Sequence, residues 1–311
     1  MHRITGFVGR ERELAEAAAA LTAGHSVLVR GRPGIGRRAF LHQLRELMAK
    51  QGRVLLWPEM TTPKNMMHTL ACQVHAQGGL KIPERIIPQR WRAQAYRDGR
   101  IDWRRIQRSL LREPVREVLA IVIDSIRDRD AIVFVETLEV PPTQAAALHA
   151  LAEIAQLAAA MDADNRRARI QRLLWRFKVK IDLEPLTRAQ VRQIVEQWLT
   201  HRPIEFDGPR VRKSFIRAVQ IDSGGVPAAV EGMLTAASTD GQVTRSKVRE
   251  YQHEAAAVYW DMTPVLVVVA ITFMAMRYIS RGLGMRELMV LAGVGSSLFY
   301  GLMFFVRRLS R

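Results

Sequence analysis

Residues 31 to 38 read GRPGIGRR, a composition suited to holding phosphate groups. Three glycines let a short loop turn its backbone N–H groups toward a polyphosphate just before a helix begins. The stretch matches the phosphate-binding pattern GxxxxGK[ST] except at its last two positions, which are arginines. We predict a nucleotide-binding loop made of Gly31, Arg32, Pro33, Gly34, Ile35, Gly36, Arg37 and Arg38.

The two arginines change the chemistry that the pattern would otherwise imply. Lysine places a compact ammonium between the β- and γ-phosphates, whereas Arg37 offers a bulkier planar fork. At Arg38 a cation replaces the hydroxyl that would ligate Mg²⁺, and a cation repels the metal. If this cation contacts phosphate in place of magnesium, nucleotide binding will be metal-independent. Three interpretations are open: a hydrolysing site, a site that binds nucleotide with slow or no hydrolysis, and a glycine-rich turn without a ligand.

The segments around the loop have the order that such a site requires. Residues 26–30 (SVLVR) predict a short buried strand, and residues 38–52 predict the helix that follows the loop. Residues 54–58 (VLLWP) predict a second strand, and residues 7–24 predict an amphipathic helix before the first strand. Strand, glycine loop, helix and strand within about thirty residues form the context that a phosphate-binding motif needs.

Strands and helices continue to alternate further along the chain. AIVFVE at 131–136 and VKIDLEPL at 179–186 are predicted strands. The alanine-rich residues 144–159 predict a helix with Thr143 as its N-cap. Further helices are predicted over 165–177, 187–199 and 208–238. We therefore expect an α/β fold: a parallel sheet flanked by helices, then a helical lid.

Composition narrows the class of partner. The 311 residues are 48% hydrophobic, enough to bury one large core or two smaller ones. Cys72 is the one cysteine, which excludes an internal disulfide and a cysteine-based metal motif. The formal net charge of +17 predicts anionic partners, such as nucleic acid, phospholipid headgroups or nucleotide phosphates.

Two apolar segments near the C-terminal end predict a transmembrane hairpin. Residues 262–276 are uncharged over fifteen positions and residues 288–306 over nineteen. The second can cross about 30 Å of hydrocarbon, and the first can do so if Arg277 snorkels. The first residues of the chain are charged and lack the apolar core of a signal peptide. The alternative is a buried helical pair in a soluble domain.

The expected orientation places the nucleotide domain in the cytoplasm, on the inner membrane of a bacterium. Three arginines after residue 306 fit the positive-inside rule, but three others between the two spans would then lie outside. Gly293, Ser297 and Gly301 recur every four residues, so they form one strip of small side chains. This strip favours close helix packing, either within the hairpin or in a homo-oligomer.

Two other segments are strongly basic. Residues 85–116 hold ten arginines, together with Trp91, Tyr96 and Trp103, a combination used to clamp phosphates and stack bases in nucleic acids. The alternative is a solvated helical insertion whose aromatics face the core. The predicted helix over 165–177 carries arginines on one face. That face could be solvated, contact anionic lipid, or offer an arginine to a neighbouring subunit's phosphate.

An ordered set of motifs resembles AAA+ and STAND-type P-loop ATPases, in particular the initiator-like branch. The motifs are FVGRERELAEAAAAL, GRPGIGRRAFL, VFVETLE, LEPLTRAQVRQIV and SGGVPAAVEGML, which together cover roughly residues 5 to 240. The resemblance implies an ATP-binding, oligomer-forming protein. It implies that Val8 and Gly9 lie near the adenine, and that Pro227 lies near the nucleotide from the lid.

In that family an acidic strand end holds magnesium and polarises water. The resemblance places Glu136 at the metal-binding and catalytic aspartate, and Thr137 at the catalytic glutamate, where it cannot act as a carboxylate base. A rival strand end is Asp124, but only six residues separate the two apolar runs, too few for the helical crossover of a parallel sheet. We therefore predict a helix over 114–128 and prefer Glu136.

These observations define the expected organisation and two classes of function. The predicted parts are a nucleotide-binding α/β domain over 1–186 with an arginine-rich insertion at about 60–130, a lid over 187–242, a juxtamembrane helix over 243–261 and the hairpin over 262–311. The first function is a membrane-anchored ATP-binding switch with impaired hydrolysis, for which Mg²⁺ is a doubtful cofactor. The second is a non-hydrolysing scaffold that recruits a protein or nucleic acid to the membrane.

Overall fold

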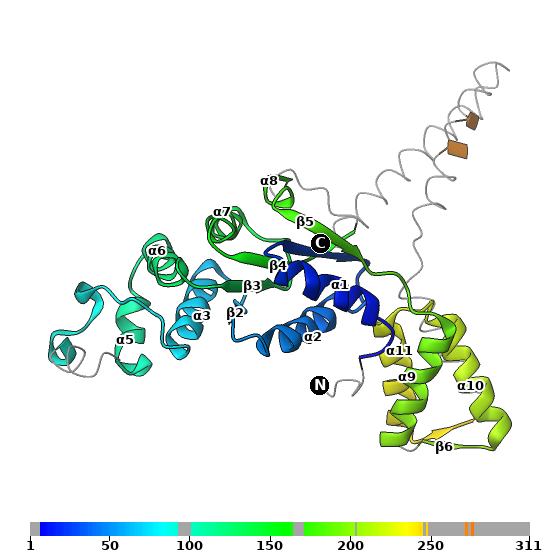
Figure 1. The fold of residues 1–311 in the computed structure, drawn as a ribbon. Helices are drawn as coiled ribbons and strands as arrows, with labels where there is room; N and C mark the ends of the chain where they lie inside the picture. The colour runs from blue at the N-terminus through cyan, green and yellow to red at the C-terminus, as the bar shows by residue number, and fades with distance from the viewer. Residues whose placement is uncertain are drawn as a thin grey trace. The chain divides into compact units, whose positions relative to one another are not determined.

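The computed structural model describes residues 7–92, 101–163, 171–202 and 204–244, together with positions 247, 271, 272, 275 and 276. The chain divides into two compact units, Met1–Ala255 and Ala256–Arg311. The first unit contains a five-stranded sheet and a group of helices that follows it (Figure 1).

All strands of the main sheet run parallel, in the order β2-β3-β4-β1-β5. Their bounds are β1 Ser26–Gly31, β2 Val54–Leu56, β3 Ala131–Val135, β4 Gln156–Asp162 and β5 Phe177–Asp182. β1 therefore lies inside the sheet, between β4 and β5. The predicted fold class, a parallel sheet flanked by helices, is confirmed.

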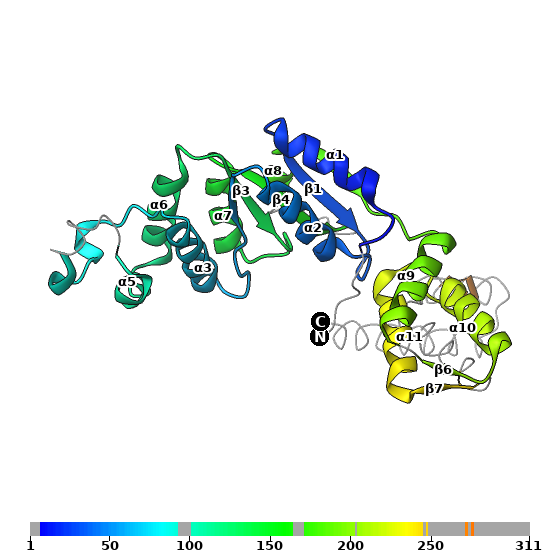
Figure 2. The same cartoon turned by 60° about the horizontal axis from the view of Figure 1, so that its bottom comes forward.

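Helices cover both faces of the sheet (Figures 1 and 2). Side chains alternate along each strand, so Val27 and Val29 of β1 pack into one apolar cluster and Leu28 into another. The first cluster also holds α1 (Glu11–Thr22) and α2 (Arg37–Ala49). Helices of the second cluster are α3 (Pro63–Ala76), α6 (Val115–Ile126), α7 (Pro142–Leu151) and the short α8 (Gln171–Leu174).

The segment between β2 and β3 is a helical insertion. α3 and α6 pack against each other, and η1 (Glu84–Ile86) and α5 (Trp103–Leu110) lie beside them. The prediction of helix over 114–128 is confirmed by α6, which excludes Asp124 as a strand end. Glu136, the residue after β3, therefore lies at the carboxyl end of a strand that pairs with β2 on one side and β4 on the other.

Three helices after β5 form a separate core. They are α9 (Arg188–His201), α10 (Pro209–Asp222) and α11 (Pro227–Asp240), joined by a two-stranded sheet of β6 (Glu205–Phe206) and β7 (Gln242–Val243). α9 begins with a capping box, in which Thr187 and Gln190 satisfy each other's backbone N–H groups. This group of helices occupies the place of the predicted lid.

The predicted helix over 144–159 is confirmed as far as Leu151 and wrong beyond it. α7 ends at Leu151, and residues from Gln156 onward form β4. Alanine favours helix by only a few tenths of a kcal/mol over most residues, and burial in the middle of a two-sided sheet outweighs that preference. Three alanines at 158–160 are at most 1% exposed, where small side chains let helices approach the sheet. Thr143 is not the N-cap, because α7 begins at Pro142 after Pro141.

The predicted membrane hairpin falls almost entirely outside the described residues. Of segments 262–276 and 288–306, four positions are described. Within the described part of the chain, no helix has the length and apolarity needed to cross a bilayer. Residues 165–170 of another predicted helix and most of the juxtamembrane segment also lie outside the described ranges.

Candidate functional site

The loop after β1 lies at a point where the chain leaves the sheet toward opposite faces. β1 leads through the loop to α2, which packs on one face, and the neighbouring strand β4 leads to α8, which packs on the other. Parallel α/β sheets bind ligands at such a switch point, beyond the carboxyl ends of the strands. Gly31 pairs in register with Asp162, so the start of the loop and the end of β4 are adjacent.

The glycines give the loop its path. Gly34 and Gly36 have φ of 78° and 94°, in the left-handed region that favours glycine. Ile35 between them is 1% exposed and anchors the loop in the core, whereas Arg32, Pro33 and Gly34 face solvent. A Cβ at Gly31 would come within 2.6 Å of the Ile35 Cγ2, so the anchor requires glycine there.

Helix α2 begins at the end of this loop without a side-chain cap. Its N-cap is Gly36, which has no side chain to accept a hydrogen bond from the first turn. The first N–H groups of a helix lack partners within the helix, and the helix dipole adds positive potential there. The loop and the first turn of α2 together therefore favour an anion.

Arg38 forms an ion pair with the predicted metal ligand. Its Nε lies 3.0 Å from Glu136 Oε1, and the Trp57 ring donates from Nε1 to the same oxygen at 2.9 Å. Trp57 is itself stacked between the rings of His42 and Phe134, at centroid distances of 4.3 and 5.6 Å. Glu136 is thus contacted by the residue that follows β2 and by the first turn of α2.

Arg37 lies beside a second carboxylate. Its guanidinium nitrogen is 3.9 Å from Asp162 Oδ2, and both side chains are about four-fifths buried, with 22% and 21% exposed. Each of the two loop arginines therefore faces an acidic residue at a strand end, Arg37 at β4 and Arg38 at β3.

These contacts affect whether the site can bind magnesium. The residues that would share a hydrated metal with phosphate already face guanidinium groups, and Arg38 stands where a hydroxyl ligand would be. Among the described residues no three acidic, histidine or cysteine side chains come together as a metal site. The donor set does not fit Mg²⁺ in its usual role. Thr137, next to Glu136, offers a hydroxyl and no carboxylate for activating water.

Arg10 ties the loop to the rest of the domain. This side chain is 4% exposed and donates to two backbone oxygens, that of Ile35 at 3.3 Å and that of Glu184 at 2.7 Å. Burial lowers the pKa of Arg10, and the acidic neighbours Glu13 and Glu184 act in the opposite direction. The bonds connect the segment before α1, the loop and the segment after β5.

The segment at Val8 and Gly9 touches the lid helices. Val8 packs on the lid core, and the Gln190 side chain of α9 donates to the Gly9 carbonyl at 3.1 Å. Gly9 has φ of 78°, and a Cβ there would collide with Gln190. The residues predicted to lie near the adenine therefore sit where the sheet domain meets the lid.

Lid helix α11 contacts the loop directly. The N–H of Ala228, in the first turn of α11, donates to the Gly34 carbonyl at 3.1 Å. A Cβ built on Gly36 would lie 3.8 Å from the Pro227 ring. The structure thus brings Pro227 to the loop and gives the start of α11 a hydrogen-bond partner.

Sequence reasoning missed three residues of this site: Arg10, Trp57 and Asp162. Arg10 is part of the FVGRE motif, but only contacts across the fold show that it holds the loop. Asp162 was hidden by the wrong helix over 144–159, and the aspartate that ends the MD dipeptide after a run of alanines was the available signal. Trp57 ends a predicted strand, so its position could have been inferred.

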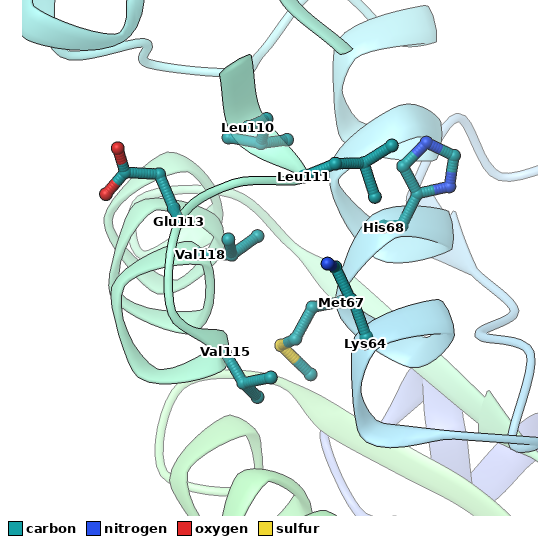
Figure 3. Close-up of a pocket in the computed structure, with 8 residues that line it drawn as sticks. All are labelled: Lys64, Met67, His68, Leu110, Leu111, Glu113, Val115 and Val118. Atoms are coloured by element: carbon teal, nitrogen blue, oxygen red, sulfur yellow. The ribbon is translucent and has the colours of Figure 1, made fainter. Parts of the chain in front are cut away.

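Two cavities lie away from the loop. One, of about 10 Å³, lies between α3 and the turn joining α5 to α6, with Met67, Val115 and Val118 directed toward it (Figure 3). It has room for one water at most. Another, of about 450 Å³, lies at the amino ends of the strands, near Ser26, Ala131 and Gln156. Neither cavity includes a predicted site residue.

No known family model matches the chain, and no curated protein matches its sequence. Solved structures give a partial likeness in fold to RuvB, the Holliday junction branch migration motor of Thermotoga maritima. That structure has a TM-score of 0.47 and 11% identity, covering 89% of this chain and 83% of RuvB. A single-residue variant of RuvB gives a TM-score of 0.48 and 12% identity over the same shares.

Proposed function

We propose that the chain is a nucleotide-binding switch that holds the polyphosphate of ATP on loop residues 31–38 without magnesium. The observation that carries this proposal is the pairing of Arg38 with Glu136 at 3.0 Å, beside Arg37 and Asp162, on a glycine loop that opens a helix. The glycine loop supplies an anion site, and the arginines supply the charge that a metal would bring.

When a nucleotide binds, each loop arginine would exchange its carboxylate partner for a phosphate group. Guanidinium groups bind phosphate through two parallel N–H donors, and such charge-assisted bonds are about twice as strong as neutral ones. Arg38 is 65% exposed on its side chain, so it can turn from Glu136 toward a phosphate without disturbing the core. The exchange needs no metal ligand and no movement of the sheet.

The same arrangement disfavours hydrolysis. Turnover of ATP needs a group that orients or deprotonates a water in line with the leaving group, and a cation that neutralises the charge developing on the phosphates. Thr137 supplies no carboxylate, and Glu136 is already bonded to Trp57 and Arg38. We infer slow hydrolysis or none, which suits a switch rather than a motor.

Contacts between the loop and the lid would transmit nucleotide binding from the loop to the lid helices. Gly34 bonds to α11, and Arg10 joins the loop to the segment that leads into α9. A ligand on the loop changes the surroundings of both contacts. We propose that the lid passes this change to a homo-oligomer contact and to the hairpin predicted over 262–311, which anchors the protein in the bacterial inner membrane with the nucleotide domain in the cytoplasm.

The test is ATP and ADP binding by the full-length protein in detergent, measured by calorimetry, with two matched variants. Gly36→Asp places a carboxylate at the loop, whereas Gly24→Asp imposes the same residue at another left-handed glycine, with φ of 83° and open space around it. We expect micromolar ATP binding by the native protein and Gly24→Asp, and none by Gly36→Asp. Equal binding by both variants, or none by the native protein, contradicts the proposal.

A scaffold is the second candidate function, favoured by the insertion. Four arginines of α5, α6 and the turn between them are exposed and form no ion pair with a described residue: Arg104, Arg108, Arg112 and Arg116. Exposed arginines close together in the sequence suit a phosphate backbone. DNA or RNA binding that weakens steeply with salt and ignores ATP, in a protein that binds no nucleotide, would replace the switch with this function.

A further inference from the structure

Trp175 is unusually exposed. Its side chain lies between α8 and β5 and is 84% accessible, and it is the one large aromatic that the structure describes as exposed. It is held in place by its neighbours, because Leu173 and Phe177 are both buried in the core. Tryptophan has a large apolar ring with one polar N–H, and an exposed one on a fixed segment indicates a contact surface.

The surroundings of Trp175 are basic. Arg172, Lys178 and Lys180 are exposed, and none of them forms an ion pair with a described residue. Lys178 and Lys180 lie on β5, an edge strand of the sheet whose pairing with β1 shifts in register between Phe177 and Val179, whereas Arg176 is paired with Glu153. Over residues 165–180 the sequence holds seven basic residues and no acidic one.

We propose that this Trp175 surface, formed by Arg172, Trp175, Lys178 and Lys180, binds the anionic phospholipid headgroups of a bilayer. Tryptophan favours the interface between headgroups and hydrocarbon, and each nearby Lys or Arg adds about 1 kcal/mol on an anionic surface. The two apolar segments of the sequence would keep the domain near such a surface. The inference rests on the membrane part of the proposed function and is independent of nucleotide binding.

Single-stranded nucleic acid is a poorer match. Sequence-independent binding of a single strand uses several aromatic side chains, on which successive bases stack along a basic groove. Trp175 has no second exposed aromatic side chain beside it among the described residues. A basic surface with a single exposed tryptophan fits anionic headgroups better than a row of bases.

The test reconstitutes the full-length chain in nanodiscs of zwitterionic lipid alone or with one third phosphatidylglycerol. Acrylamide quenching of Trp175 is taken as the difference between the native protein and Trp175→Phe, with and without ATP. We expect quenching about threefold weaker in anionic discs, a protection lost in high salt and in Lys178→Glu with Lys180→Glu. The matched control is Lys213→Glu with Arg217→Glu, which makes the same charge change on exposed positions of α10 and keeps the protection.

The outcomes separate the two proposals. Equal quenching in both kinds of disc contradicts the proposal that the Trp175 surface binds lipid, but leaves the proposed membrane anchor unaffected. Protection of Trp175 by single-stranded DNA alone also contradicts the lipid proposal. If the protein is incorporated into anionic discs only, and the Lys178→Glu with Lys180→Glu variant is not, lipid binding by the Trp175 surface is supported and the proposed hairpin anchor is contradicted. A protein that joins neither disc contradicts both.

Discussion

At the scale of single residues, the strength of the contact between Arg38 and Glu136 decides how the site can work. The side chains are 65% and 27% exposed, and ion pairs this open to solvent contribute about 0–1 kcal/mol. A phosphate competing for the guanidinium has only that small energy to overcome. Glu136 therefore holds Arg38 in place weakly, and it lowers the affinity for an anion by its own charge.

Removing that charge should strengthen binding. Glu136→Gln keeps the shape of the side chain and frees Arg38, so we expect ATP affinity without metal to rise about two- to fivefold, the factor that corresponds to at most about 1 kcal/mol. Calorimetry in EDTA measures it. Glu139→Gln, at an exposed carboxylate three residues away, is the matched control and should change little. A fall in affinity for Glu136→Gln in EDTA would contradict the competition between Glu136 and phosphate for Arg38.

Restoring the usual loop residues should restore magnesium dependence. The double variant Arg37→Lys with Arg38→Ser supplies a compact ammonium and a hydroxyl ligand and releases Glu136 to a hydrated metal. We expect ATP binding that is at least tenfold tighter with Mg²⁺ than with EDTA, and still no appreciable turnover, because Thr137 is unchanged. Binding and phosphate-release assays check both parts, and metal-indifferent binding by this variant counts against the assigned roles.

At the scale of elements, the loop depends on neighbours far away in sequence. Arg10 bonds the carbonyls of Ile35 and Glu184, so one side chain fixes the distance between the loop and the segment after β5. The Leu186 N–H, in turn, donates to the Gly225 carbonyl at 2.8 Å, which joins that segment to the turn before α11. The lid is thus attached to the loop through two short segments.

Loss of Arg10 should loosen this attachment. Arg10→Met keeps much of the buried volume but removes the donor to the buried Ile35 carbonyl and to the partly buried Glu184 carbonyl, which we expect to reduce the free energy of unfolding by about 1–3 kcal/mol. Thermal unfolding of the purified protein measures the change. Arg12→Met, at an exposed position on the same helix segment, should lie within about 0.5 kcal/mol of the native protein. Equal stability of both variants would refute the role given to Arg10.

Two glycines, one in the turn before α11 and one inside that helix, should respond in opposite ways to substitution by alanine. Gly225 has φ of 73°, and a Cβ there would lie 2.3 Å from the Leu186 carbonyl, so Gly225→Ala should destabilise the fold by at least about 2 kcal/mol. Gly232, inside α11, has nothing within 4 Å of a built Cβ, so Gly232→Ala should stabilise by up to about 1 kcal/mol. Denaturant unfolding compares the two, and the same sign for both would contradict the packing described.

At the scale of the whole molecule, the order of elements followed from the sequence more readily than the contacts between them. The spacing of apolar residues and the positions of glycines predicted β1, the loop, α2 and the lid helices, because both features reflect local backbone geometry. β4 was missed, because an alanine run favours helix locally and only the sheet on either side of it makes it a strand. The contact of Arg10 with Ile35 joins residues 25 positions apart, which no local pattern reveals.

The central claim is that the loop arginines stand in for magnesium. The most direct measurement is the ATP affinity of the detergent-purified full-length protein in excess Mg²⁺ and again in EDTA, with Gly36→Asp as the blocked site. The account predicts affinities within about threefold of each other, both lost in Gly36→Asp. Binding that disappears in EDTA would contradict it, because the metal would then be supplying the charge assigned to Arg37 and Arg38.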